Sequence, residues 1–331
     1  MQAVIMTAIG SPKVLQLTEL PEPAINKPSD VKVRLYAAGV NPIDTKIRRN
    51  GLLGNQPLPA ILGCDGAGEV VEIGAAVDKF SVGDRVWFFN GGLGQDPGCY
   101  AQYSVIDQRW LALMPESSDY ATAAAGPLVL ITAWEALFDR GSLQAGQTVL
   151  IHAGAGGVGH VAIQLAKLQG AKVITTVSDQ LKADFVHALG ADVIINYPRQ
   201  DFVSVVNTVT QGQGVDLVLD TVGAEVFKQS IAATKHFGRL ITLLDPGVQE
   251  FKEARLRNLL IGFELMLTPM LRNLDAARDK QIPILQQCAK WIDQGELIIH
   301  LAKTLPLEQA ITAHQLIETG HVSGKIVLIP S

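Results

Sequence analysis

A glycine-rich stretch at residues 148–160 constrains the fold of this chain more than any other part of the sequence. It reads TVLIHAGAGGVGH: a β-branched run is followed by glycines at 154, 156 and 159, and residues 161–168 then have a helical pattern. This order predicts a strand, a tight turn and a helix. In a Gly-x-Gly-x-x-Gly turn the first glycine allows the sharp bend, the second lets the backbone approach a pyrophosphate, and the third lets the helix lie close on the strand. The helix N-terminus then offers unpaired N–H groups to phosphate.

The residues after the turn make this pattern more specific. In a chain with 31 glycines such a spacing also arises by chance, and the alternative is a turn with only a structural role. Here a second β-branched strand, expected at residues 171–177, completes a strand–helix–strand unit of about 30 residues. We therefore interpret the stretch as a dinucleotide-binding turn.

Strand and helix patterns alternate through the middle third of the chain. This alternation predicts a doubly wound parallel sheet, an α/β fold that binds ligands at the carboxyl ends of its strands. The further strands are expected at residues 193–195, 215–220 and 239–244, and the helices at residues 181–189, 202–208, 227–234 and 282–294. The helix at residues 282–294 is interpreted as the last helix of this domain.

The first third of the chain has a different texture. Short strands are expected at residues 2–5, 13–18 and 31–38, and glycines interrupt the β-branched residues of 63–74 and 80–88, as in a compact barrel. A helix is expected at residues 121–137, kinked or divided at Pro127. At 331 residues the chain is long for one core, so we expect two domains. On pattern alone, the tail (helix 308–319, strand 323–329) fits either domain.

Composition limits the kinds of binding partner and the cellular compartment that we expect for this protein. A net charge of -5 argues against nucleic acid or an anionic membrane as the main partner. The uncharged residues 141–166 contain polar residues and glycines and do not form a continuous apolar run, so no membrane span is predicted. The N-terminus has no basic region or cleavage site that directs export. The three scattered cysteines, Cys64, Cys99 and Cys288, suit a reducing compartment, and we expect a cytoplasmic protein.

Five motifs in this order resemble one family: GVNPIDTK at 39–46, GCDGAG at 63–68, VGDRV at 82–86, HAGAGGVG at 152–159 and GKIVL at 324–328. The chain resembles the medium-chain dehydrogenase/reductase superfamily over residues 1–329. Within it, the resemblance is to the zinc-free quinone oxidoreductase-like (zeta-crystallin-like) branch, which includes members labelled zinc-type alcohol dehydrogenase-like. The resemblance implies a GroES-like β-barrel catalytic domain formed by residues 1–122 and 296–331, and a Rossmann domain formed by residues 123–295.

The resemblance raises the question of a metal. Zinc-dependent relatives place a Cys where this chain has Asn41, and a His where it has Cys64. A catalytic zinc needs about three protein ligands, whereas Cys64 and its neighbour Asp65 supply at most one thiolate. The structural zinc lobe needs four cysteines, and residues 90–99 contain only Cys99. We predict no zinc and interpret Cys64 as a small buried apolar residue. Without a Lewis acid, hydride addition to an already activated acceptor is favoured over alcohol oxidation.

The expected cofactor is NADPH, with NADH as the less favoured alternative. In NADPH-using relatives a Ser, a Lys and a Tyr stand where this chain has Ser178, Lys182 and Tyr197, and Val177 stands at the acidic position typical of NAD sites. Asp179 leaves an alternative open. It either holds a ribose hydroxyl or caps the helix that follows.

The resemblance also places further residues in the site. The catalytic candidates are Asn41, Asp44 and Lys46. Lys46 stands where some relatives have a Tyr, and it can supply a positive charge or a proton; alternatively, Asp44 and Lys46 are solvated surface charges. Residues 263–266 are interpreted as site lining, core packing or a subunit contact. The cofactor-binding candidates are Gly154, Gly156, Gly157, Val158, Gly159, Ser178, Lys182, Tyr197, Asp220, Val222, Gly223 and Leu243.

The predicted function is NADPH-dependent hydride transfer, without zinc, to a quinone or an α,β-unsaturated carbonyl compound. The alternatives are reduction of an enoyl thioester and a low-turnover, NADPH-binding structural or regulatory role. A homodimer is expected, because relatives commonly pair through an edge strand of the dinucleotide-binding sheet and an unpaired edge is an association surface.

Overall fold

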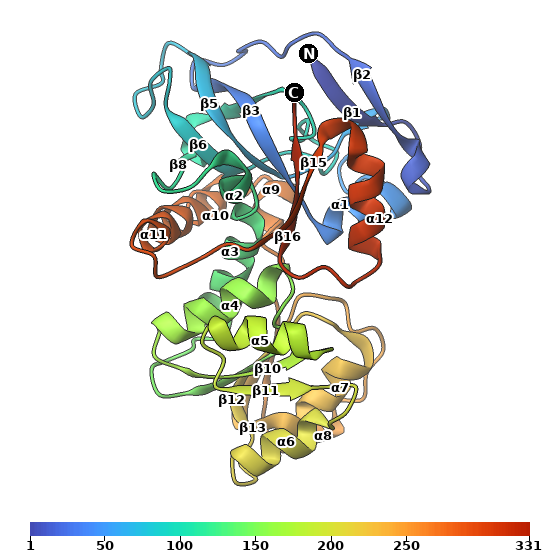
Figure 1. Cartoon of the computed structure of the whole chain (residues 1–331), viewed down its shortest axis with the longest axis vertical. Coiled ribbons are helices and arrows are strands. Elements are labelled where there is room, and N and C mark those ends of the chain that lie inside the picture. The colour runs from blue at the N-terminus through green and yellow to red at the C-terminus, as the bar shows by residue number, and fades with distance from the viewer. The chain divides into compact units, whose positions relative to one another are not determined.

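The sequence pattern changes near residue 125, and the structure changes there from one compact unit to the other. The computed structural model describes residues 1–331 and divides into two units, of which the first is Met1–Leu128 with Leu267–Ser331 and the second is Val129–Met266. In Figure 1 the second unit takes the green to pale orange part of the chain. No helix of the structure is both long and apolar enough to span a membrane.

The first unit is built on two sheets. One is three-stranded with the order β2-β1-β4; the other is seven-stranded with the order β15-β16-β3-β5-β6-β8, in which β7 also pairs with β3. Strand β16 is antiparallel to β3, with Ile326 opposite Val40, so the tail of the chain belongs to this unit. The strands are β1 (Gln2–Met6), β2 (Leu15–Glu19), β3 (Asp30–Val40), β4 (Ala60–Ile61), β5 (Asp65–Ile73), β6 (Arg85–Phe89), β7 (Tyr103–Asp107), β8 (Ala112–Leu113), β15 (Leu301–Pro306) and β16 (Lys325–Ile329).

Proline divides the helix that was predicted at residues 121–137. One helix ends before Gly126 and the next begins at Pro127, since proline fits the first turn of a helix but not its interior. A π-helical turn, η3 (Glu135–Arg140), follows directly. The helices of the first unit and this connection are α1 (Pro42–Asn50), α2 (Tyr120–Ala124), α3 (Pro127–Trp134), α9 (Thr268–Leu271), α10 (Asp275–Arg278), α11 (Gln281–Asp293) and α12 (Ala310–Glu318).

The second unit is a six-stranded, fully parallel sheet with the order β11-β10-β9-β12-β13-β14, as the alternating pattern predicts. Figure 1 shows α4 and α5 on one face and α6, α7 and α8 on the other. Leu150, Val218 and Phe227 belong to the core beneath the latter face. The elements are β9 (Thr148–Ile151), α4 (Gly157–Leu168), β10 (Lys172–Val177), α5 (Gln180–Ala188), β11 (Val193–Asn196), α6 (Phe202–Val209), β12 (Val215–Asp220), α7 (Ala224–Ala233), β13 (Thr234–Thr242), α8 (Lys252–Leu256) and β14 (Leu260–Phe263).

The unit boundaries differ from those expected for residues 123–295. Helix α11, assigned from the sequence to the parallel-sheet domain, packs against β8 and α10 in the first unit. Arg278, at the end of α10 just before α11, ties this part of the chain to the first unit. Its guanidinium lies 3.6 Å from the Trp110 ring centroid and donates to the Phe89 carbonyl at 3.2 Å and to Asn90 Oδ1 at 2.5 Å. These partners are distant in sequence, so periodicity alone does not reveal them.

Edge strand β14 was not predicted, because it is short and partly exposed. Along the segment that follows, Glu264 and Met266 are buried while Phe263 and Leu265 are exposed, so core packing accounts for two of its residues. Glu264 Oε2 accepts a hydrogen bond from Arg140 Nε at 3.2 Å. Burial, together with hydrogen bonding to Glu135, raises the pKa of Glu264 to about 9.

Candidate functional site

The glycine turn joins β9 to α4. Its left-handed residue is Ala153, with φ 51°, and not Gly154, which was predicted to make the sharp bend. Gly154 is needed for packing, because a Cβ there would lie 2.0 Å from Thr175 Oγ1 on β10. A Cβ on Gly159 would lie 2.3 Å from the Ala153 carbonyl oxygen, so this glycine lets the helix lie close to the turn that follows β9.

The opening of α4 fits a pyrophosphate. A Cβ on Gly156 would meet only the Ala153 carbonyl oxygen, at 3.2 Å, so the rest of this position is open. No side chain caps the helix at Gly156. The N–H groups of Gly157, Val158 and Gly159 have no acceptor within the helix, since the first N–H groups of any helix lack one. Together with the positive end of the helix dipole, they can bind the phosphates of a dinucleotide.

His152 supports the turn from below. It is buried, with Nδ1 3.2 Å from Thr176 Oγ1 and Nε2 2.9 Å from Ser230 Oγ. Thr176 Oγ1 also accepts the Ala153 N–H at 3.0 Å. Burial lowers the pKa of His152 to about 4, so the ring is neutral near pH 7. His152 is therefore a structural residue.

Ser178, Asp179 and Lys182 form a cluster at the carboxyl end of β10. Lys182 Nζ donates to Ser178 Oγ at 2.9 Å and lies 3.7 Å from Asp179 Oδ2. Asp179 Oδ1 accepts the backbone N–H of Lys182 at 2.9 Å, which makes Asp179 the N-cap of α5. This hydrogen bond and the one from Ser178 lower the pKa of Asp179. Of the two alternatives for Asp179, the structure shows the helix cap.

Tyr197 lies beside this cluster through its backbone. Its N–H donates to the Val177 carbonyl at 3.1 Å, and its side chain is exposed. Ser178, Lys182 and the backbone of Tyr197 therefore lie at the carboxyl end of the sheet.

Asp220 is not available to a cofactor, contrary to the prediction. Its side chain is fully buried at the end of β12. Oδ1 accepts the N–H groups of Val222 and Gly223, each at 2.9 Å, and Oδ2 accepts the Thr242 hydroxyl at 2.9 Å. The Asp220 carbonyl accepts the Leu243 N–H at 3.0 Å. Asp220 therefore fixes the loops that contain the cofactor candidates Val222, Gly223 and Leu243.

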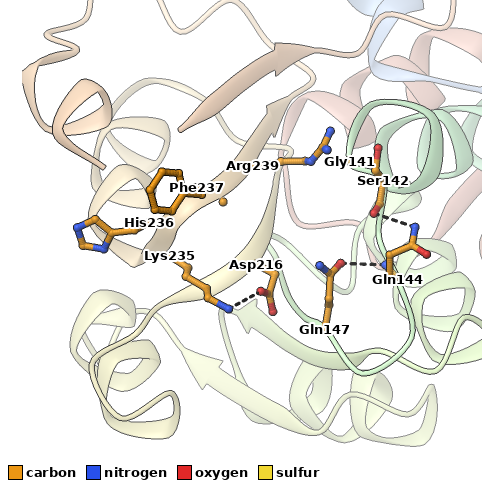
Figure 2. Close-up of a pocket in the computed structure, with 10 residues that line it drawn as sticks. Gly141, Ser142, Gln144, Gln147, Asp216, Lys235, His236, Phe237 and Arg239 are labelled. Atoms are coloured by element: carbon orange, nitrogen blue, oxygen red, sulfur yellow. Dashed lines mark hydrogen bonds and ion pairs between the residues drawn. The ribbon is translucent and has the colours of Figure 1, made fainter. Parts of the chain in front are cut away.

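A pocket of about 540 Å³ lies at the opposite, amino-terminal end of this sheet (Figure 2). Its charged groups are used within the chain: Lys235 Nζ lies 3.0 Å from Asp216 Oδ1, and Arg239 donates to the Arg140 carbonyl. Ligands of doubly wound sheets bind at the carboxyl ends of the strands. This pocket is therefore not the cofactor site. Its lining residues are Gly141, Ser142, Gln144, Gln147, Asp216, Lys235, His236, Phe237, Gly238 and Arg239.

In the first unit, Asn41 is fully buried and both ends of its amide are used. Its Nδ2 donates to Asp65 Oδ2 at 2.8 Å, and its Oδ1 accepts from Lys325 Nζ. Lys325 also donates to the Val40 carbonyl at 3.2 Å and lies 3.7 Å from Asp65 Oδ2. These contacts give Asn41 a structural role, and its catalytic role stays a prediction.

Asp44 is neither a free catalytic carboxylate nor a solvated surface charge. It is fully buried at the start of α1, where Oδ2 accepts the Asn41 N–H at 2.8 Å and the Tyr100 hydroxyl at 3.0 Å. Burial raises the pKa of Asp44 to about 7. Lys46, on the exposed side of α1, has no ion-pair or hydrogen-bond partner. Partial desolvation lowers the pKa of its ammonium group.

Lys325 and Asp65 complete the buried cluster around Asn41, and the sequence alone predicted no role for Lys325. A lysine inside the apolar strand GKIVL was the available signal, because an unpaired buried lysine is rare. Tyr100 gave no comparable signal, since an isolated tyrosine in a loop has no characteristic spacing.

The cysteines of this unit are small buried residues. Cys64 and Cys99 are free, and burial raises the pKa of both thiols well above the ordinary value. Across residues 1–331 no three His, Cys, Asp or Glu side chains are grouped so as to hold a metal ion.

Comparison with known proteins agrees with this geometry. Residues 27–116 match the family model described as alcohol dehydrogenase GroES-like domain, and residues 189–328 match the one described as zinc-binding dehydrogenase. A quinone oxidoreductase of Pseudomonas aeruginosa is 32% identical over 332 residues, with 98% of each chain covered. The chloroplastic NADPH-dependent alkenal/one oxidoreductase of Arabidopsis thaliana is 29% identical over 339 residues, which cover 100% of this chain and 80% of that protein.

A solved structure has the same fold. The quinone oxidoreductase of Escherichia coli, complexed with NADPH, superposes with a TM-score of 0.88 at 28% identity, and the match covers 100% of each chain. The parallel sheet with its glycine turn and the GroES-like unit are thus those of nicotinamide-dependent enzymes. The chain belongs to the medium-chain dehydrogenase/reductase superfamily, as an oxidoreductase of its zinc-free quinone oxidoreductase-like branch.

Proposed function

We propose that this protein uses NADPH, without zinc, to reduce a quinone or an α,β-unsaturated carbonyl compound. The observation that carries the proposal is the pairing of the Lys182 ammonium with the Ser178 hydroxyl at the end of β10. A cation and a hydroxyl suit a 2′-phosphate. Asp179, the carboxylate that would favour NADH, is engaged as a helix cap. The names of the two curated relatives, a quinone oxidoreductase and an alkenal/one oxidoreductase, support the acceptor class.

Bound NADPH supplies the hydride, and the chain's own residues supply binding, orientation and charge. The first N–H groups of α4 hold the pyrophosphate, while Lys182, Ser178 and Tyr197 surround the 2′-phosphate. The loop of Val222 and Gly223, fixed by Asp220, presents its backbone to the rest of the cofactor.

Lys46 is proposed as the residue that stabilises or protonates the substrate that accepts the hydride. Hydride addition to a quinone or an enone leaves negative charge on an oxygen. An exposed ammonium without an internal partner can stabilise that charge or donate a proton to it. The lowered pKa of Lys46 makes proton donation easier than from an ordinary lysine.

Substrate screening tests the proposal. NADPH absorbance is followed with a panel of quinones, enones and enoyl thioesters, and the proposal expects turnover with the first two classes. Turnover with thioesters alone would make the protein an enoyl-thioester reductase. Tight NADPH binding with no turnover would instead support a structural or regulatory role.

Elemental analysis and a chelator test the metal prediction. We expect no stoichiometric zinc in the purified protein, because Asn41 and Cys64 do not supply the ligand set. One zinc per chain, together with activity lost on chelation, would overturn this part of the proposal.

Pairing through β14 is the proposed route to a homodimer. This strand lies at the edge of the parallel sheet, and Leu260 and Phe263 on it are more than half exposed. An exposed apolar edge strand favours addition of a second strand. A monomer mass at micromolar concentration would contradict the dimer. A cytoplasmic location belongs to the same proposal, since all three cysteines are free.

A further inference from the structure

Three buried side chains of the first unit form one hydrogen-bonded network. Asp44 lies on α1, Tyr100 precedes β7, and His314 lies on α12. The Tyr100 hydroxyl donates to Asp44 Oδ2 at 3.0 Å, and its oxygen lies 3.3 Å from His314 Nε2. All three residues are fully buried. Each end of the network carries a buried polar atom without a hydrogen-bond partner, namely Asp44 Oδ1 and His314 Nδ1.

Charge decides where this cluster holds a proton. Asp65 faces the Lys325 ammonium and accepts hydrogen bonds from Asn41 and from the Leu128 N–H. Asp44 accepts only from neutral donors, the Asn41 N–H and the Tyr100 hydroxyl. A proton taken up by the cluster therefore resides on Asp44. The groups that face the network are Asn41, Arg48, Cys64, Asp65, Cys99 and Lys325.

The two other members of the network, Tyr100 and His314, stay uncharged near neutral pH. Burial, with the positive charge of Arg48, lowers the pKa of His314 to about 3, so its ring carries one proton above that pH. Burial also raises the pKa of the Tyr100 hydroxyl and of both thiols. Of the three members of the network, Asp44, whose burial raises its pKa to about 7, is the one that changes charge near neutral pH.

The network has two hydrogen-bond directions. With Asp44 ionised, Tyr100 donates to Asp44 and accepts from the Nε2–H of His314, and Nδ1 is left as an unpaired acceptor. When one proton enters at Nδ1, the Nε2 proton passes to the Tyr100 oxygen and the Tyr100 proton passes to Asp44. The network then runs in the opposite direction and has gained one proton.

We propose that Tyr100 and His314 are positioning residues that act through Asp44, and that reversal of this network sets how firmly the first turn of α1 is held. Ionised Asp44 accepts the Asn41 N–H as a charge-assisted bond at the positive end of α1, and the protonated form loses that charge. Lys46 lies two residues further along the same helix. The link to Lys46 rests on the proposed function; the network itself does not.

Thermal unfolding from pH 5 to pH 8 tests the network without reference to activity. Folded Asp44 holds its proton more tightly than the unfolded chain does, so it contributes stability at low pH that is lost as pH rises toward 7. The melting temperature of the natural protein should fall by roughly 5 °C relative to that of Asp44→Asn over this range. Asp201→Asn, at an exposed helix cap, is the matched control and should follow the natural profile. A constant difference between the natural protein and Asp44→Asn would overturn the proposal.

Two further variants separate a network from simple packing. Tyr100→Phe removes a donor to ionised Asp44, so the inflection of the stability profile should move to higher pH. His314→Phe leaves the Tyr100 hydroxyl with Asp44 as its only partner, so the inflection should move to lower pH. Shifts in the same direction, or no shift in either variant, would refute the network even if Asp44→Asn does not fold.

Activity then tests the link to Lys46. The pH profile of kcat/KM should have an inflection near pH 7 that moves in the same directions in Tyr100→Phe and His314→Phe. Shifts in stability without shifts in kcat/KM would overturn the link. Absence of any NADPH-dependent turnover would contradict the proposed function and leave the stability result standing.

Discussion

The polar residues of the two units are used in opposite ways. In the first unit, Asn41, Asp65 and Lys325 are buried and satisfy one another. In the second unit, Lys182 and Tyr197 lie at the open carboxyl end of the sheet, where a ligand can reach them. Buried polar groups must be paired, because the free-energy cost of burying an unpaired group exceeds the net stabilisation that one hydrogen bond gives. Partly exposed groups remain available to a ligand, since water molecules form hydrogen bonds with them until the ligand binds.

This contrast separates residues that resemble a catalytic set from residues that can contact a ligand. Asn41 and Asp44 have the chemistry of an active site, but their atoms are already used. The glycine turn has almost no side-chain chemistry, yet its open face and unpaired N–H groups fit a pyrophosphate. Accessibility therefore favours the glycine turn over the buried cluster as the proposed cofactor site.

The largest expected effect is a loss of stability in the buried cluster of Asn41, Asp65 and Lys325. Lys325→Met leaves the Asp65 carboxylate buried without its counter-ion, so the free energy of unfolding should fall by about 3–5 kcal/mol. Chemical denaturation measures this. Lys182→Met is the matched control, and because it removes a lysine from a partly exposed site its stability should barely change. Equal losses in the two variants would remove the contrast between the units.

A smaller effect is expected in the glycine turn. A Cβ on Gly159 meets the Ala153 carbonyl at 2.3 Å, so Gly159→Ala should destabilise the protein by about 1–3 kcal/mol. Gly156→Ala should leave stability nearly unchanged but weaken NADPH binding, because its Cβ would enter the open face of the turn. Thermal unfolding and cofactor titration of both variants check this, and the reverse pattern would show that the turn is assigned wrongly.

The smallest effect is expected at the cap of α5. Asp179→Ala removes the acceptor for the Lys182 N–H, so the melting temperature should fall slightly. NADH affinity should not change, because the Asp179 carboxylate caps α5 and is not expected to contact the cofactor. A clear loss of NADH binding would instead assign Asp179 to a ribose hydroxyl.

Much of the second unit could be predicted because its signals are local. The β-branched runs, the helical spacing and the glycine turn each depend on neighbouring residues, and the parallel sheet follows from their alternation. Strand β14 depends on its pairing with β13, and the placement of α10 and α11 depends on distant partners such as Trp110 and Asn90, which contact Arg278; no periodicity records these contacts.

The site was harder to predict than the fold. In the sequence Asp44 resembles a surface residue, and only the contacts of α1 with α12 and the hydrogen bond from Tyr100 show that it is buried. Asp220 was placed correctly at a strand end, but the direction of its carboxylate depends on the backbone of Val222 and Gly223. The Ser178–Lys182 pair was predictable because both residues lie within one turn of a helix start.

Titration of both cofactors against Lys182→Ala is the most direct test of the central claim. If Lys182 and Ser178 bind the 2′-phosphate, loss of one charge-assisted hydrogen bond should weaken NADPH binding on the order of ten- to a hundredfold. NADH binding should hardly change, because the glycine turn contacts the part of the dinucleotide that both cofactors share. An NADPH affinity in Lys182→Ala equal to that of the natural protein would contradict the assignment of NADPH.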